Sequence, residues 1–183
     1  EELRKIGLLS VIASCNTEKN SFNLRYISLD QNQIDQLNKD IGFPLGQYTF
    51  PINKLIPDAL DIVPSLHTVA CDPHHELGTI FTQEEVRIIA EFLKDIDVIL
   101  DIKVYRLLLM FEENLLGILW IWGKGITEID LPALSIFAKQ IGLSLERARL
   151  FQEVQDLALT DPLTSLNNRR SLFELGRIEF SRA

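Results

Sequence analysis

Two apolar runs joined by a short polar turn constrain this chain more than any other feature. Residues 107–111 are wholly apolar and residues 115–122 nearly so, and Glu112-Glu113-Asn114 separates them. Apolar runs without alternation are typical of strands covered on both faces. The pair therefore predicts a buried antiparallel hairpin, and Gly117 within it suggests a bulge or the close approach of another backbone.

Further strands are predicted on the N-terminal side of this hairpin. Residues 6–13 and 22–29 lie on either side of a polar turn, which is typical of a second antiparallel hairpin. Residues 48–52 have the pattern of a short strand. Residues 53–80 are interrupted by three prolines and give no clear element.

Two helices have recognisable ends. Asp30 can cap a helix that Gly42 ends, and Thr82 with Glu85 forms a capping box for another helix. The predicted fold is therefore α/β, with an antiparallel sheet of about five to six strands and flanking helices.

The last helix is too long for the predicted domain to cover. Its pattern runs from about Asp130 to Leu159, roughly 45 Å, and Asp161-Pro162 ends it. Its second half therefore projects, pairs with another helix, or both. The apolar positions that predict a homodimer of parallel helices are Leu145, Ala148, Phe151, Val154 and Leu157. The alternative is that this stripe packs back on its own domain.

Composition limits the partners and the compartment. The net charge is −8, which argues against a nonspecific nucleic-acid binder and against anionic membrane surfaces. Cys15 and Cys71 are far apart and suggest neither a disulfide framework nor a zinc site. No apolar run reaches the length of a membrane span. We expect a cytoplasmic segment without a metal site, and a chain starting at Glu1 rather than Met is expected to be part of a longer protein.

Three stretches, taken in order, resemble a GAF domain, the small-ligand sensor fold of signalling proteins. They are residues 42–51 with Gly-Phe-Pro-Leu and Tyr-Thr-Phe-Pro, the hairpin around residues 106–119, and the final helix from Thr127. The resemblance covers about residues 1–155. It implies a sensory and regulatory module at residues 1–145, followed by a signalling helix at residues 146–160.

A second resemblance is short and contiguous. Residues 161–170 match the DxLTxLxNRR opening motif of GGDEF domains, the diguanylate cyclases, which join two GTP molecules into cyclic di-GMP. The matching positions are Asp161, Leu163, Thr164, Leu166, Asn168, Arg169 and Arg170. Residues 161–183 would be the start of such a domain, and its signature turn is not among them. We therefore expect this segment to be non-catalytic, with GTP and Mg²⁺ bound only by the rest of the domain in the parent cyclase.

The GAF resemblance implies an unidentified small ligand between the sheet and residues 53–96. Candidate lining residues are Tyr48, His67, Cys71, Trp120 and Trp122. Trp120 and Trp122 share one strand face, where aromatic core packing is the alternative. The Cys71–His75 cluster could attach a bilin, ligate haem or bind zinc, but a partly exposed polar loop is the simpler interpretation. The competing functions are a ligand-free dimerisation module and a regulator of a degenerate GGDEF domain.

Overall fold

The computed structural model describes residues 8–56, 68–96, 98, 103–123 and 125–159, with side chains described through residue 155. The chain divides into two compact units, residues 1–142 and 143–183. The division falls within the last helix, and each unit is described by itself.

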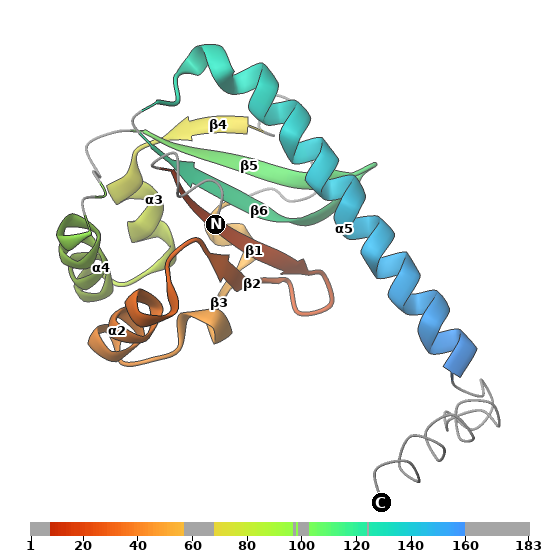
Figure 1. Ribbon diagram of the computed structural model, residues 1–183, viewed down its shortest axis with the longest axis horizontal. Coiled ribbons are helices and arrows are strands. Elements are labelled where there is room, and N and C mark those ends of the chain that lie inside the picture. Colours follow the sequence, from red (N-terminus) through yellow and green to blue (C-terminus); the bar gives the residue numbers. More distant parts are fainter. Residues whose placement is uncertain (1–7, 57–67, 97, 99–102, 124, 160–183) are drawn as a thin grey trace, which may run out of the picture. The chain divides into compact units, whose positions relative to one another are not determined.

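The first unit is built on a six-stranded antiparallel sheet (Figure 1). The strand order is β3-β2-β1-β6-β5-β4, so the hairpin of β5 and β6 is flanked by other strands on both sides. The strands are β1 Leu9–Asn16, β2 Ser21–Ile27, β3 Thr49–Pro51, β4 Thr68–Cys71, β5 Val104–Phe111 and β6 Asn114–Trp122. The predicted α/β architecture of five to six strands is confirmed.

In the described part of the chain, four α-helices accompany the sheet, with short 3-10 turns at Leu45–Gln47, Ile52–Lys54 and Glu128–Asp130. The helices are α2 Gln31–Ile41, α3 Pro73–Ile80, α4 Gln83–Asp95 and α5 Leu131–Leu159. The predicted caps hold: the Asp30 carboxylate accepts from the Gln33 amide at 2.9 Å, and the Thr82 amide donates to Glu85 at 2.7 Å. Gly42 ends α2 at a φ of 89°, in the left-handed region that favours glycine.

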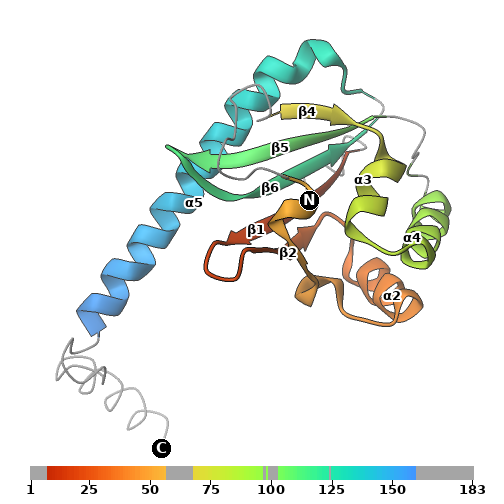
Figure 2. The ribbon, with the colours of Figure 1, turned by 180° about the vertical axis from the view of Figure 1, so that it is seen from behind.

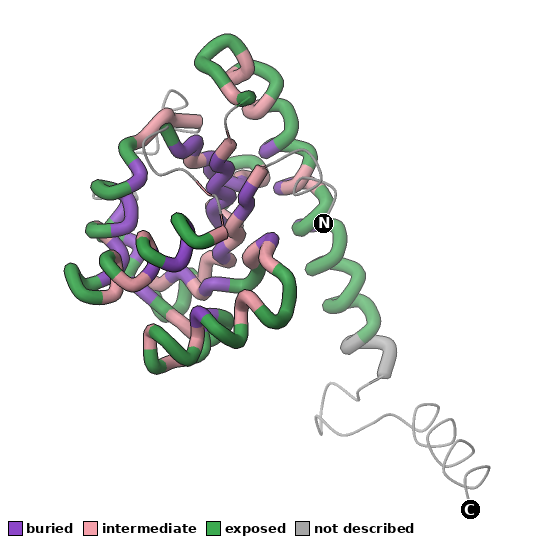
Figure 3. The backbone as a smooth tube through the Cα atoms, turned by 60° about the vertical axis from the view of Figure 1, so that its left-hand side comes forward, coloured by how far each residue is buried: buried purple, intermediate pink, exposed green. Residues whose placement is uncertain are grey.

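Side chains of β5 and β6 alternate between two core clusters, one on each face of the sheet. Even-numbered positions such as Leu108 and Trp120 join α2, α3 and α4 in the larger cluster. Odd-numbered positions such as Leu109 and Ile121 join the first half of α5 through Ala138. Figure 2 shows that α5 lies on the opposite face of the sheet from α2, α3 and α4. Figure 3 shows that the buried residues gather where strands and helices meet.

Two glycines permit close backbone contacts on this sheet. A Cβ on Gly117 would lie 2.4 Å from the Ala13 carbonyl oxygen, and the β5–β6 register shifts nearby, between Leu109 and Met110. The predicted bulge or close approach at Gly117 is therefore confirmed. A Cβ on Gly142 of α5 would lie 2.2 Å from the Met110 carbonyl oxygen, so the helix meets β5 backbone to backbone.

The interpretation of residues 71–75 as a polar loop is wrong. Cys71 ends β4, and Asp72 caps α3 by accepting from the His75 amide at 2.7 Å. Pro73 occupies the first turn, where a missing amide hydrogen costs nothing. His67 and residues 161–183 lie outside the described residues.

Candidate functional site

A cavity of about 70 Å³ lies between the sheet and the helices α2, α3 and α4. Strands β1, β2 and β6 form one wall, and the three helices form the other. Nearly all of its lining is apolar: Leu9, Val11, Leu24, Ile27, Leu29, Leu37, Leu45, Glu76, Leu77, Ile80, Phe81, Ile89, Leu93, Trp120 and Trp122. Glu76 is the one ionisable residue in this set.

Glu76 belongs to a buried polar cluster at the edge of the cavity. It is 3% exposed, and α3 directs it toward the sheet. Arg106 of β5 donates through Nη1 to both carboxylate oxygens, at 3.2 and 3.3 Å. Trp120 of β6 donates through Nε1 to Oε1 at 2.7 Å. Because the charge is compensated and hydrogen-bonded, the cluster fixes α3 against β5 and β6.

Trp122 lies two residues further along β6 on the same face, and its environment differs. Its side chain lines the cavity and the residue is 5% exposed. Its Nε1 is buried and has no hydrogen-bond partner among the described residues. Buried indole N–H groups usually find a partner, so this donor stands out beside the satisfied Trp120.

Tyr48 is held by its own contacts and is not among the residues that line this cavity. Its ring stacks on Phe43 and Phe81, with centroid separations of 5.0 and 4.8 Å. Its hydroxyl donates to the Ile80 carbonyl at 3.1 Å, and Lys54 Nζ donates to the same oxygen at 3.0 Å. Tyr48 thus joins the start of β3 to the end of α3.

Cys71 lies near Glu76 rather than on the cavity wall. Burial, together with the Glu76 carboxylate, raises the pKa of the Cys71 thiol to about 11. The thiol is therefore protonated near neutral pH, which makes it a poor nucleophile. Among the described residues, no group of three His, Cys, Asp or Glu side chains is arranged to hold a metal ion.

The structure brings together two of the five predicted ligand-site residues, Trp120 and Trp122, on the cavity wall. Sequence reasoning missed Glu76 and Arg106. The available signal was weak: Glu76 falls on the same helical face as Leu77 and Ile80, and Arg106 interrupts an apolar strand. A charged residue at such a position implies a buried partner, but the sequence does not say which one.

A second space of about 250 Å³ lies beside β5 and α5. Thr68, Met110, Glu112 and Lys139 are among its lining residues. The candidate site is the first cavity, which is enclosed by apolar side chains and lies beside the buried Glu76–Arg106 ion pair.

Comparison with known proteins identifies the fold. A solved structure of the photoproduct state of GAF3 from Slr1393 of Synechocystis sp. PCC6803 is similar, with a TM-score of 0.51 and 16% sequence identity. The similarity covers 84% of this chain and 92% of that one. This chain has a GAF-like α/β fold. No protein-family model and no curated protein matches its sequence. In the described part of the chain, no helix is long and apolar enough to span a membrane.

Proposed function

We propose that this chain is a sensory module that binds a small molecule between its sheet and helices α2–α4 and relays the binding event through α5. The observation that carries the proposal is the cavity beside the buried Glu76–Arg106–Trp120 cluster. A ligand there would touch both β6 and α3. It would therefore bias how α3 sits on the sheet.

The relay rests on the path of the chain after the sheet. Helix α5 runs without interruption from Leu131 to Leu159. Its first half packs on β5 and β6 through Leu134, Ala138 and Gly142. Residues 161–170, which resemble the start of a GGDEF domain, follow directly. We propose a diguanylate cyclase as the output in the parent protein, with GTP and Mg²⁺ bound there.

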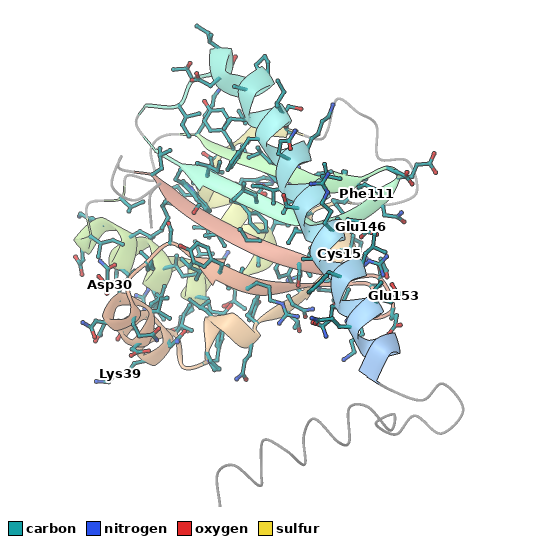
Figure 4. All side chains as sticks on the ribbon, turned by 45° about the vertical axis from the view of Figure 1, so that its right-hand side comes forward. Cys15, Asp30, Lys39, Phe111, Glu146 and Glu153 are labelled. Carbon is teal, nitrogen blue, oxygen red and sulfur yellow. The ribbon has the colours of Figure 1, made fainter. Side chains whose placement is uncertain are left out.

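We further propose that the second half of α5 pairs with a second copy. Arg149 donates to Glu146 at 2.8 Å and to Glu153 at 3.2 Å, which makes one side of this segment charged. Figure 4 labels the two carboxylates on α5. Phe151 and Val154 are 65% and 62% exposed. A partner helix on this apolar side would bury them.

Helix geometry narrows the predicted seam. In an α-helix, every three residues turn about 60° less than a full turn. Over the nine residues from Leu145 to Val154 this adds up to about 180°, so the two positions lie on nearly opposite sides of the helix. Positions Leu150, Phe151, Val154 and Leu157 share a narrower arc. We therefore propose that the seam consists of these four residues, with Ala148 beside it and Leu145 on the opposite side of the helix.

Native mass spectrometry of the purified 183-residue chain tests ligand and dimer together. The expected result is a dimer that releases a small molecule on activation. A dimer with no bound molecule, even after incubation with cell extract, would favour a ligand-free dimerisation module.

Matched variants locate the dimer contact. Val154→Glu with Leu157→Glu places like charges across the seam, and sedimentation should then show monomers at micromolar concentrations. Glu153→Lys on the charged side serves as the control and should remain dimeric. A wild-type chain that is monomeric at high micromolar concentration would refute the helix pairing.

A further inference from the structure

Four aliphatic residues of α5 recur at intervals of seven, and we call them the outer stripe: Ile136, Leu143, Leu150 and Leu157. Seven residues turn an α-helix about 20° short of two full turns, so these positions form one nearly straight line. A strict seven-residue repeat is typical of helices that pair with helices, because it keeps one side facing the partner. The outer stripe therefore continues the proposed seam toward the start of α5.

The start of the outer stripe lies on the side of α5 that faces away from the sheet. Ala138 and Ile141 belong to the core between the helix and the sheet. Ile136 is two residues from Ala138 and therefore lies about 200° around the helix axis from it. Ile136 and Phe137 are 62% and 42% exposed. A helix that is apolar on two opposite sides is normally covered on both, and the sheet covers one of them.

A second set of positions lies three residues before each member of the outer stripe and completes the repeat: Ala133, Gln140, Arg147 and Val154. We call these eight positions the extended seam. Arg147 is the one charged residue among them. A charge between two paired helices costs far more than the neighbouring leucines return, unless the facing helix supplies a counterion.

Glu146 of the second copy is placed to be that counterion. Each seam residue inserts between four residues of the facing helix. When the helices are parallel and in register, those four include the counterpart of Arg147 and the residue before it, the partner's Glu146. Within one chain, Arg149 donates to the two Glu146 carboxylate oxygens at 2.8 and 2.9 Å from the neighbouring turn. This contact holds the carboxylate on the helix beside the extended seam.

We propose that a second copy of this chain covers α5 from Ile136 to Leu157, with the helices parallel and in register, and that Arg147 binds the partner's Glu146 in the middle of the extended seam. This inference rests on the proposed function, because it extends the helix pairing proposed there. A charged seam residue weakens the pairing relative to leucine and fixes its register, since a shifted register separates the charges.

Disulfide cross-linking tests the register. The chain has two cysteines, and Cys15→Ala with Cys71→Ala provides a background without them. In this background, Ile136→Cys should form a linked dimer on mild oxidation, because a disulfide requires Cα atoms within about 7 Å. Gln152→Cys lies about 160° around the helix axis from Ile136 and should stay unlinked. An unlinked Ile136→Cys, or equal linking of both variants, would overturn the inference.

Sedimentation tests how far the pairing extends. Ile136→Glu should weaken dimerisation by about 100-fold, since two large side chains leave the interface. The residue is exposed in the single chain, so circular dichroism should stay unchanged. Gln152→Glu adds the same charge on the other side of α5 and should dimerise as the wild type does. If Val154→Glu with Leu157→Glu gives monomers but Ile136→Glu does not, the extension is overturned while the proposed pairing stands. A monomeric wild-type chain would overturn both.

Two substitutions test the contact between Arg147 and the partner's Glu146. Arg147→Leu should tighten the dimer by about 10-fold or more, because it replaces a buried charge with an apolar side chain. Glu146→Gln should weaken the wild-type dimer by about 10-fold or more, and should change the Arg147→Leu dimer much less. Equal weakening in both backgrounds would show that Glu146 acts only through Arg149 of its own helix, and would overturn this contact.

Discussion

The two faces of the sheet are built on different principles, although both are covered by helices. The face toward α2, α3 and α4 holds the buried Glu76–Arg106 pair, the cavity and the Trp122 indole, whose N–H has no partner among the described residues. The core toward α5 is formed by apolar side chains around Leu107, Leu109 and Ile121. Its buried Tyr105 hydroxyl is satisfied by donating to the Ile126 carbonyl at 3.2 Å.

Under the proposed function, the two faces of the sheet have different roles. Buried polar groups weaken a core unless something is gained from them, so under the proposed function the first face, which holds the buried ion pair, is the one that responds to a ligand. The second face is joined to α5 by the backbone contact between Gly142 and Met110. A tight contact of that kind transmits a shift of the sheet to the helix instead of absorbing it.

The largest expected effect concerns the ion pair on the first face. Glu76→Ala leaves Arg106 and the Trp120 N–H without their acceptor, and should lower the free energy of unfolding by about 3–5 kcal/mol. Urea denaturation followed by tryptophan fluorescence measures it. The control is Glu84→Ala, which removes the exposed Glu84–Arg87 pair at 3.8 Å and should change stability by less than about 0.5 kcal/mol. Equal effects of the two substitutions would show that the buried pair stabilises the fold no more than an exposed pair does.

The reactivity of the Cys71 thiol tests the burial and the negative charge beside it on the same face of the sheet. Because burial and Glu76 raise the pKa of Cys71 to about 11, its thiolate fraction at pH 8 should be roughly 100-fold below that of an ordinary thiol. Alkylation by iodoacetamide, followed by mass spectrometry, should be correspondingly slow. Its rate should rise with pH until about pH 11, near the pKa. Alkylation as fast as in the urea-unfolded chain would contradict the burial of Cys71 beside Glu76.

The raised pKa of Cys71 also makes the stability of the fold depend on pH. The folded state holds the proton more tightly than the unfolded chain, so this contribution is present below the unfolded pKa. It is lost as the pH rises toward about 11. In Cys71→Ala, the free energy of unfolding should therefore decrease less steeply as the pH rises into the alkaline range. Urea denaturation at several pH values measures this.

Two glycine substitutions sharpen the contrast at α5. Gly142→Ala places a Cβ against the Met110 carbonyl and should destabilise the protein by about 1–3 kcal/mol through overpacking. Gly78→Ala in α3 meets nothing within 4 Å among the described residues. It should instead stabilise the helix by about 0.4–1 kcal/mol. Thermal denaturation gives both signs, and a neutral Gly142→Ala would show that α5 does not touch β5 closely.

The smallest effect is expected at Tyr48. The Ile80 carbonyl accepts from both Tyr48 and Lys54, so Tyr48→Phe leaves that oxygen satisfied. The loss of stability should stay below about 1 kcal/mol. Tyr48→Phe with Lys54→Met should cost more than the sum of the two single substitutions. Strict additivity in this double-mutant cycle would show that the two donors do not share one acceptor.

Local signals in the sequence predicted most of the elements of the first unit. The capping residues Asp30 and Thr82 and the paired runs around residues 112–114 specify structure within a few residues of themselves. β4 and α3 were missed because their signals are short and lie among prolines. The ion pair was missed for a different reason, since residues 76 and 106 meet only through tertiary packing.

The candidate site was likewise predicted only as far as local sequence patterns reach. The spacing of Trp120 and Trp122 places both on one strand face, and the structure finds both on the cavity wall. No pattern in the sequence indicates that one indole is paired and the other is not. That difference depends on where α3 presents Glu76, which the sequence alone does not determine.

Xenon binding tests the central claim, that the face toward α2–α4 accepts a small molecule, most directly. Methyl NMR spectra of the selectively labelled chain would be recorded under increasing xenon pressure. The account predicts saturable shifts at Leu24, Ile89 and Leu93, which line the cavity. Leu109 and Ile121, in the core toward α5, should stay unshifted. Unchanged signals at the three lining residues, or equal shifts on both faces, would contradict it.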